Sequence, residues 1–394
     1  MEDKTLRILQ SIDTFYPTID GAINVVKFYA EELNKTDKCS VLAPNPERKS
    51  RYRDNEKFNV IRCKSIKGPE NYRGALPSFD KKLDKIMTAE NFDIIHAHSP
   101  FSMGKYCVRF GKKHKIPVVL TLHTRYKADF IRALKGFKPL VNFMMRFIMR
   151  TFNKADSVWT VSYDARKILR EYGYKGDIQV VRNGTDFIYP ENAEKLIEKV
   201  NGLNGLKDKK NVFVFVGRIA KYKNIDLLAD ALKILKDKGV DFTMLMVGGG
   251  FDEKEFRKKI EELRLSDRFV FTGAIKDRTL LQGYYLRSDL LLFPSTFDVC
   301  SLAVIESAAH KVPALVIKDS SSAENIVDNE NGFLAEENAE SIAEKIIFAL
   351  SNKKILKDAG ENAYRTLYRT WDDVAKEVRE KYVKVIKEYR QKRL

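Results

Sequence analysis

How this chain folds is decided by one segment, Leu290-Leu-Leu-Phe-Pro-Ser-Thr-Phe-Asp298-Val-Cys-Ser-Leu-Ala-Val-Ile-Glu306. Its apolar start predicts a buried strand, which Pro294 ends. A helix is expected to begin at Ser301, a residue type that often caps helices. The N–H groups of its first turn, around Ser301 and Leu302, lack intrahelical partners. They would lie at the edge of the sheet and favour a bound phosphate.

Two acids flank this predicted anion site. Asp298 precedes it, and Glu306 lies one to two turns inside the helix. Carboxylates accept hydrogen bonds from hydroxyl groups and repel anions, so they suit a diphosphate that carries hydroxyl-rich groups. A nucleotide sugar fits that description. Taken alone, however, such a pair is more often a loop cap and a solvated helix residue.

Length and composition indicate a soluble protein of two or three domains. The chain has 394 residues, of which 44% are apolar, and no apolar run is long enough to span a bilayer. Its N-terminal residues lack the basic start and apolar core of a signal peptide. Four scattered cysteines favour a reducing cytosol over a disulfide framework or a zinc site: Cys39, Cys63, Cys107 and Cys300.

The positive charge is concentrated in one part of the chain. The formal net charge is +17, and residues 101–150 contain twelve Lys and Arg against the single acid Asp129. A basic face of this kind predicts an anionic partner, which could be a membrane, a nucleic acid or an acidic polymer.

Short apolar runs alternate with helical patterns in both halves, which predicts α/β domains with parallel sheets covered by helices. In the first half, strands are expected at Leu6–Ser11, Ser40–Leu42, Asn59–Arg62, Ile94–Ala97, Val118–Leu122, Ser157–Val161 and Ile178–Val181, with helices at Ile23–Leu33, Lys81–Ala89 and Tyr163–Tyr172. In the second half, strands are expected within Asn211–Arg218 and at Phe242–Val247, Phe269–Thr272, Leu290–Pro294 and Ala314–Ile317.

The charged segment Pro190–Lys210 is predicted to connect the two domains. Apolar positions in Trp371–Leu394 predict a terminal amphipathic helix. We therefore expect an N-terminal domain at residues 1–188, a C-terminal domain at 189–371, and a helix at 372–394 that returns to the first domain.

Several predicted strands end in chemically informative residues. His123 ends one strand, and Arg218 and Lys223 follow another, where two cations could bind a diphosphate. Each also has a structural interpretation, as a buried histidine or as solvated cations at a helix start. Met246–Gly250 only partly matches a dinucleotide-binding fingerprint and is a weak signal.

Together these residues resemble the retaining, nucleotide-sugar-dependent glycosyltransferases of family 4, which have the GT-B fold. The resemblance covers nearly the whole chain in the family's order. Its motifs are Pro17–Gly21, Asp93–His98, Thr121–Thr124, Val181–Asp186, Gly217-Arg218 with Lys223-Asn224, Phe293–Pro313 with Asp298 and Glu306, and Ala323–Leu334.

The resemblance implies two doubly wound Rossmann-like domains and a role for each matching residue. Glu306 would bind the ribose, and Arg218 and Lys223 the diphosphate. Asp298 would contact sugar hydroxyls and His123 the transferred sugar. The remaining donor-binding positions are Gly21, Gly248, Ile275, Ser301 and Leu302.

The resemblance also implies a reaction without a resident cofactor. The donor would be a nucleotide sugar, UDP-glucose being the favoured one, and no metal is expected because the chain contains no Asp-x-Asp. Retention would follow from front-face attack by the acceptor hydroxyl, with a donor phosphate taking its proton. No Ser/His/Asp triad or paired-acid arrangement competes with this mechanism.

Three positions depart from the family pattern. The first acid is Asp298 where Glu is usual, Ser301 stands where Gly is usual, and Lys311 replaces the Gly before the helix-end proline. These departures bear on the identity of the sugar and on the efficiency of transfer.

The acceptor is suggested by Arg125–Lys154, where cations interleave with large apolar residues. A helix of this composition can lie in the headgroup layer of an anionic membrane, although its apolar face could also pack on its own domain. Pro17–Gly21 and His123–Phe130 look most like the diacylglycerol glucosyltransferase branch. We therefore expect transfer of a hexose to a lipid such as diacylglycerol, by a cytoplasmic enzyme peripheral to the inner face of the cell membrane.

Other functions remain open at this stage. A glycosyltransferase with a soluble or cell-wall glycan acceptor would share every donor motif. A nucleotide-sugar 2-epimerase has the same two-domain fold, but its acidic and histidine placements do not match. A nucleic-acid binder would explain the charge, yet the sequence contains no zinc-finger, RNP-type or helix-turn-helix signature.

Overall fold

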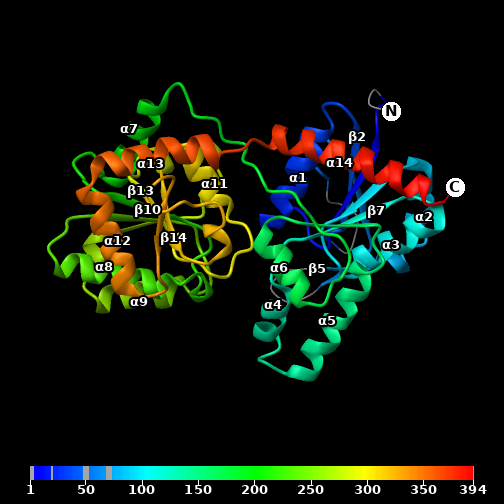
Figure 1. The fold of residues 1–394 in the computed structure, drawn as a ribbon, viewed down its shortest axis with the longest axis horizontal. Coiled ribbons are helices and arrows are strands. Elements are labelled where there is room, and N and C mark those ends of the chain that lie inside the picture. Colours follow the sequence, from blue (N-terminus) through cyan, green and yellow to red (C-terminus); the bar gives the residue numbers. More distant parts are fainter. Residues whose placement is uncertain (1–3, 19–20, 48–52, 68–72, 394) are drawn as a thin grey trace. The chain divides into compact units, whose positions relative to one another are not determined.

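The computed structural model describes residues 4–18, 21–47, 53–67 and 73–393, which form two compact units (Figure 1). The N-terminal unit comprises Met1–Asn183 and Trp371–Leu394, and the C-terminal unit comprises Gly184–Thr370. The division precedes residue 188 because Thr185 N donates to Arg369 O (2.8 Å) and Asp186 pairs with Arg278. Residues 184–186 are thus bonded within the C-terminal unit.

The N-terminal unit is built on a seven-stranded parallel sheet with the order β3-β2-β1-β6-β7-β8-β9. The strand order reverses between β1 and β6, which is where doubly wound sheets bind ligands. Its strands are β1 (Arg7–Ser11), β2 (Lys38–Pro44), β3 (Asn59–Cys63), β6 (Ile94–Ala97), β7 (Val118–Leu122), β8 (Ser157–Thr160) and β9 (Gln179–Val180), beside a small antiparallel pair, β4 (Ser65–Lys67) and β5 (Arg73–Ala75), that the sequence did not predict.

Helices cover this sheet, and the last of them comes from the far end of the chain. They are α1 (Gly21–Leu33), α2 (Leu83–Glu90), α3 (Ser102–His114), α4 (Tyr126–Ala133), α5 (Lys138–Phe152), α6 (Tyr163–Glu171) and α14 (Trp371–Gln391). As predicted, α14 is amphipathic, and it packs against α1 (Figure 1). The Trp371 ring stacks on Phe28 with centroids 5.2 Å apart, and Arg379 pairs with the buried Asp37.

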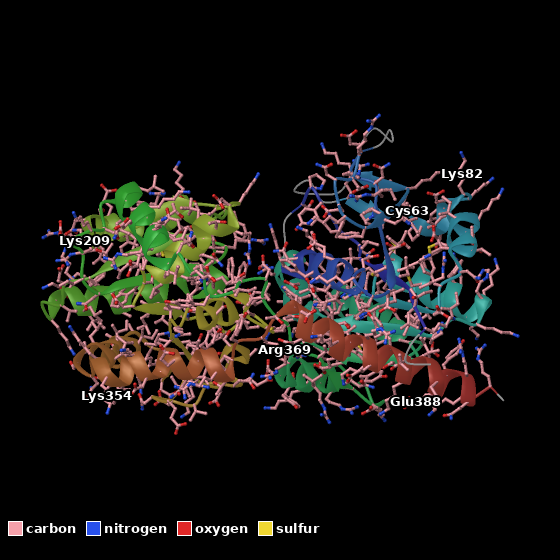
Figure 2. All side chains as sticks on the ribbon, turned by 90° about the horizontal axis from the view of Figure 1, so that it is seen from above. Cys63, Lys82, Lys209, Lys354, Arg369 and Glu388 are labelled. Atoms are coloured by element: carbon pink, nitrogen blue, oxygen red, sulfur yellow. The ribbon has the colours of Figure 1, made fainter. Side chains whose placement is uncertain are left out.

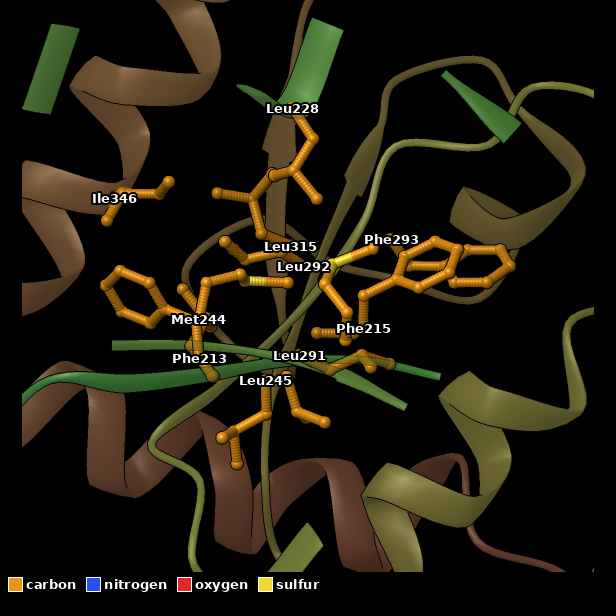
Figure 3. Close-up of a cluster of buried hydrophobic side chains, with 14 of the residues drawn as sticks. Phe213, Phe215, Leu228, Met244, Leu245, Leu291, Leu292, Phe293, Leu315 and Ile346 are labelled. Atoms are coloured by element: carbon orange, nitrogen blue, oxygen red, sulfur yellow. The ribbon is translucent and has the colours of Figure 1, made fainter. Parts of the chain in front are cut away.

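The C-terminal unit contains a six-stranded parallel sheet with the order β12-β11-β10-β13-β14-β15. Its order reverses between β10 and β13. Leucine, methionine and phenylalanine side chains fill its core, and Phe215 stacks on Phe293 across these two strands (Figure 3). The strands are β10 (Val212–Val216), β11 (Thr243–Val247), β12 (Phe269–Gly273), β13 (Leu290–Phe293), β14 (Ala314–Ile317) and β15 (Phe333–Ala335).

The helices of this unit are α7 (Ala193–Asn204), α8 (Ile225–Asp237), α9 (Glu253–Glu262), α10 (Arg278–Leu286), α11 (Leu302–Ala309), α12 (Ala339–Ser351) and α13 (Lys353–Thr366). The prediction that Pro190–Lys210 is a connection was wrong, because most of it forms α7. Leu196 and Val200 are buried there, and the helix packs against α10 at Gly283, where an added Cβ would lie 2.8 Å from Val200. The helix was not predicted because charged residues surround these two buried positions in the sequence.

Charged side chains cover the outside of both units (Figure 2). Lys82, Lys209 and Lys354, for example, are exposed. No helix in the described parts of the chain combines the length and the hydropathy that crossing a membrane requires.

Candidate functional site

The N-terminus of α11 begins where the sequence placed it, but Ser301 does not cap it. Ser301 occupies the N-cap position with extended backbone angles and makes no side-chain cap hydrogen bond. Its Oγ is buried and has no hydrogen-bond partner among the described residues. Because the serine side chain does not occupy them, the N–H groups of Leu302 and the residues after it remain suitable donors for an anion.

Lys223 and Asp298 meet beside this helix end. Lys223 Nζ lies 2.5 Å from Asp298 Oδ1, and Ser295 Oγ donates to Asp298 Oδ2 at 2.5 Å. The ammonium also lies over the Phe293 ring, 5.4 Å from its centroid. The family resemblance assigns Lys223 to the diphosphate of a donor and Asp298 to its sugar hydroxyls. In the structure the two side chains form one ion pair.

Glu306 lies inside α11 with both carboxylate oxygens bonded. Arg278 Nη2 donates to Oε1 at 3.0 Å, and Tyr285 Oη donates to Oε2 at 2.8 Å. Burial raises the pKa of the Glu306 carboxyl, and the charge of Arg278 opposes that shift. Each oxygen keeps a second lone pair, so the carboxylate can still accept from a hydroxyl group.

Arg278 was not found by sequence reasoning. It forms a two-pronged ion pair with Asp186, donates to Glu306, and places its guanidinium 3.8 Å from the centroid of the Phe187 ring. Nothing around Arg278 in the sequence distinguishes it from other cations at helix starts. The one available signal was Asp186, which belongs to the Val181–Asp186 motif and is the ion-pair partner of Arg278 in the structure.

Residues after β10 and β11 form a close backbone contact that explains the glycines there. Gly248 has φ +143°, and an added Cβ would lie 1.9 Å from Gly217 O. Its N–H donates to Gly273 O at 3.0 Å and is therefore engaged by backbone. Arg218, which follows Gly217, is exposed, and Ile275 packs against the core of the unit.

Lys311 stands where the family usually has glycine, and its backbone conformation explains that preference. Its φ is +59°, in the left-handed region that glycine adopts most readily. The side chain forms an ion pair with Glu361 (3.1 Å) and lies over the rings of Tyr189 and Tyr364. These contacts hold a lysine in a conformation that would otherwise be unfavourable.

In the N-terminal unit, three histidines gather where β6 and β7 end. His98 Nδ1 lies 2.8 Å from His123 Nε2, and the His96 and His98 rings stack with centroids 4.1 Å apart. Burial lowers the pKa of His96 and His98 well below the usual value, and that of His123 to about 4. At neutral pH all three are therefore uncharged, and His123 can bind a hydroxyl group but does not act as a cation.

Gly21 is the first residue of α1 and is exposed, with nothing within 4 Å of an added Cβ. The space beside it is thus open, as a contact with a ligand requires. Two residues of the Pro17–Gly21 motif, 19 and 20, lie outside the described residues.

The basic segment Arg125–Lys154 forms two helices, α4 and α5, and not the single helix that its composition suggested. Lys135 (φ +47°) and Gly136 (φ +76°) break it, because these left-handed residues end α4. The two helices extend away from the sheet of their unit (Figure 1). Four large apolar side chains on these helices and the turn between them are 39–60% exposed: Ile131, Phe137, Leu140 and Phe143.

Both halves of the chain match models of known families. Residues 19–187 match the model described as Glycosyltransferase Family 4, and residues 197–366 match the model described as Glycosyl transferases group 1.

Individual relatives agree with these matches. Alpha-monoglucosyldiacylglycerol synthase of Acholeplasma laidlawii is 26% identical, over 89% of this chain and 90% of the relative. The synthase of that name from Streptococcus pneumoniae is 25% identical, over 79% and 70%. Among solved structures, HepE of Anabaena in complex with UDP-glucose superposes with a TM-score of 0.75 at 18% identity, covering 96% of this chain and 99% of that one. That likeness establishes the GT-B fold.

Proposed function

We propose that this chain, which belongs to glycosyltransferase family 4 and has the GT-B fold, transfers glucose from UDP-glucose to diacylglycerol. In this proposal the transfer occurs at an anionic membrane surface and retains the configuration at the anomeric carbon. Two relatives are named alpha-monoglucosyldiacylglycerol synthase, and their names support diacylglycerol as the acceptor.

The donor site is proposed at the carboxyl ends of β10 and β13. The uncapped first turn of α11 and the cations of Lys223 and Arg218 are suited to a diphosphate. Glu306, which pairs with Arg278, would accept hydrogen bonds from the ribose hydroxyls. In this proposal the lysine, the arginine and the helix end neutralise the leaving diphosphate without a metal ion.

Transfer is proposed to occur on one face of the sugar. The bond between the anomeric carbon and the diphosphate oxygen breaks as the acceptor hydroxyl oxygen bonds to the same carbon. The hydroxyl proton passes to the departing phosphate oxygen. Because the acceptor enters on the face from which the nucleotide leaves, the anomeric configuration is retained.

One observation carries the choice of a membrane acceptor: large apolar side chains are exposed among cations on α4 and α5. Phe137 is 60% exposed and Phe143 57% exposed, while Lys135, Lys138 and Arg146 are exposed beside them. A soluble acceptor gives no reason to expose these phenylalanines. Insertion into a headgroup layer would bury them and pair the cations with lipid phosphates.

A donor screen in the presence of vesicles tests the proposal. Nucleotide release from UDP-, GDP- and ADP-glucose is followed with vesicles of anionic lipid, with and without diacylglycerol. Release that requires both UDP-glucose and diacylglycerol is expected. Equal release with a soluble glycan in place of vesicles would favour the alternative acceptor class and refute the lipid assignment.

A further inference from the structure

A buried network of hydrogen bonds connects His123 to the C-terminal helix. It comprises His123, His98, Gln10, Tyr382, His96 and Thr121. Gln10 and Tyr382 are 0% exposed, and Tyr382 is contributed by α14. We call these six residues the histidine network.

The bonds of the histidine network connect its members in one continuous series. His98 Nε2 lies 2.6 Å from Gln10 Oε1, and Gln10 Nε2 donates to Tyr382 Oη at 3.0 Å. Tyr382 Oη lies 2.6 Å from His96 Nδ1, and His96 Nε2 lies 2.6 Å from Thr121 Oγ1. With the 2.8 Å contact between His123 Nε2 and His98 Nδ1, the series reaches His123.

The orientation of the Gln10 amide fixes the directions of the bonds that lead to His98 and His123. Its carbonyl oxygen only accepts, so His98 must donate from Nε2, and its bare Nδ1 must accept from His123 Nε2–H. On the other side, the amide nitrogen donates to Tyr382. Among the described residues His96 Nδ1 is the one acceptor within reach of the Tyr382 hydroxyl proton, so the hydroxyl donates there. His96 is left with its proton on Nε2, which donates to Thr121.

A second contact agrees with this orientation of the amide. Burial raises the pKa of the Cys39 thiol, and a hydrogen bond from Gln10 opposes that shift, as a donor to sulfur does. In this orientation the amide nitrogen serves both Tyr382 and Cys39.

We infer that Tyr382 is a positioning residue for His123: through Gln10 and His98 it holds the His123 proton on Nε2, so that Nδ1 is presented as a hydrogen-bond acceptor. No described residue is found to bond this Nδ1, and His123 is partly exposed. Rotation of the Gln10 amide would reverse all five bonds and move the proton to Nδ1. Tyr382 opposes that rotation because its phenol is a strong donor and a poor acceptor. After rotation it would accept from His96 at the 2.6 Å contact and donate to the Gln10 oxygen only at the 3.0 Å contact.

The inference deepens the proposed function and rests on it for its chemical meaning. A sugar hydroxyl that meets a bare Nδ1 must donate its proton to the ring, and a hydroxyl that meets Nδ1–H must accept. The tautomer thus selects how His123 holds a hydroxyl of the transferred sugar. A helix remote in sequence contributes to this selection.

The test is nuclear magnetic resonance on the whole protein with 15N-labelled histidine, of which the chain has five. The 15N shifts distinguish protonated from bare ring nitrogens. In the wild type, His96, His98 and His123 are expected to be single tautomers protonated on Nε2. In Tyr382→Phe, the His123 shifts are expected to move toward averaged values, because the amide of Gln10 can then rotate.

Two further variants keep the test decisive. Gln10→Met is of similar size and should also average the His123 shifts. Tyr106→Phe is the matched control, since Tyr106 is buried in the same unit and donates to Asp84, outside the network. A wild-type His123 protonated on Nδ1, or a single unchanged tautomer in both Tyr382→Phe and Gln10→Met, would overturn the inference. Neither donor nor acceptor is present in this experiment, so its outcome is separate from that of the proposed function.

Discussion

The Lys223 ammonium and the Asp298 carboxylate neutralise each other, with Nζ 2.5 Å from Oδ1, beside the N-terminus of α11. Both side chains are mostly buried, with 12% and 21% of their surfaces exposed. A diphosphate that binds at this helix end therefore competes with Asp298 for the lysine. Removal of the lysine and removal of the aspartate are therefore expected to have opposite effects on binding of the diphosphate.

Lys223→Met is expected to lower kcat/KM for the donor about 100-fold, because the charge that stabilises the leaving diphosphate is removed. Lys221→Met is the matched control: Lys221 lies in the same helical turn but is exposed and pairs with Glu255. Initial rates of UDP release measure both variants. Equal losses in the two variants would show that Lys223 has no special role.

Asp298→Ala is expected to tighten binding of UDP while slowing transfer. Removal of the carboxylate frees Lys223 for the diphosphate, and a gain of about threefold to tenfold in affinity is expected for a partly buried pair. The sugar loses the hydroxyl contact proposed for Asp298, so kcat should fall. Calorimetry with UDP and turnover with UDP-glucose measure the two effects, and weaker UDP binding would contradict the competition.

UDP binding in Arg278→Gln is expected to depend on pH. Burial raises the pKa of the Glu306 carboxyl, and Arg278 holds it down, so removal of the arginine moves this pKa further up. As pH falls through the raised pKa, Glu306 becomes protonated and loses its charge-assisted bonds to the ribose. The dissociation constant for UDP should therefore rise by about tenfold on the acidic side.

Two variants serve as controls for this pH dependence. Glu306→Gln should bind UDP weakly at every pH, since it has no carboxyl to titrate. Arg257→Gln removes a guanidinium that also lies 3.8 Å from a ring centroid, that of Phe271, and pairs with Glu253 on α9. It should retain the wild-type profile, and the same acidic loss in Arg257→Gln would exclude Arg278 as its cause.

Stability is expected to decrease as pH falls from 6.5 toward 4, in part through His310. Burial lowers the pKa of His310 to about 4, so the unfolded chain binds a proton in this window that the folded protein does not. Its Nδ1 bonds Glu306 O, while Nε2 is buried without a partner among the described residues, which leaves a second ring proton no acceptor.

His310→Gln should therefore flatten the pH dependence of the urea midpoint, by an amount that corresponds to about 2 kcal/mol between the ends of the window. His114→Gln, whose ring stacks on Phe110 in the other unit, is the control. An unchanged pH dependence in His310→Gln would contradict the assignment.

Phe137→Ser combined with Phe143→Ser is expected to reduce binding to anionic vesicles about 1000-fold, because burial of each ring contributes about 2 kcal/mol and each step of about 1.4 kcal/mol is about tenfold in affinity. Phe79→Ser is the control, since Phe79 is 73% exposed on the same unit but lies outside α4 and α5. Flotation with vesicles of anionic and neutral lipid measures the loss. If the double variant floats as the wild type does, these helices do not insert.

The parallel strands were predictable because a buried strand of a parallel sheet is apolar on both faces. Ile94–Ala97, Val118–Leu122 and Ala314–Ile317 were predicted at their observed bounds. The α7 helix was missed, since only a narrow stripe with Leu196 and Val200 is buried. The break in Arg125–Lys154 was missed too, because Lys135 gives no sign in sequence that it will adopt a positive φ.

The sequence could suggest candidate site residues only where they form motifs. Lys223, Asp298 and Glu306 are candidates because of their order along the chain, and their assignment to the site stays a prediction. The side chains that contact them in the structure were not predicted. Arg278 reaches Glu306 from another helix, and Tyr382 reaches His96 from the end of the chain, so neither pairing has a local signature. The Ser301 side chain was assigned as a cap from its residue type, while its observed rotamer leaves the helix donors unused.

The position of α14 has a consequence for biosynthesis. The ribosome makes the strands of the N-terminal unit first. Trp371, Arg379 and Tyr382, which cover Phe28, Asp37 and His96, are made only after the whole C-terminal unit. The C-terminal unit can therefore complete its core during translation, before α14 is available to the unit made first. A stop codon before Trp371 would leave Asp37 and the histidines without these partners, so such a truncation should be recognised by cellular proteases.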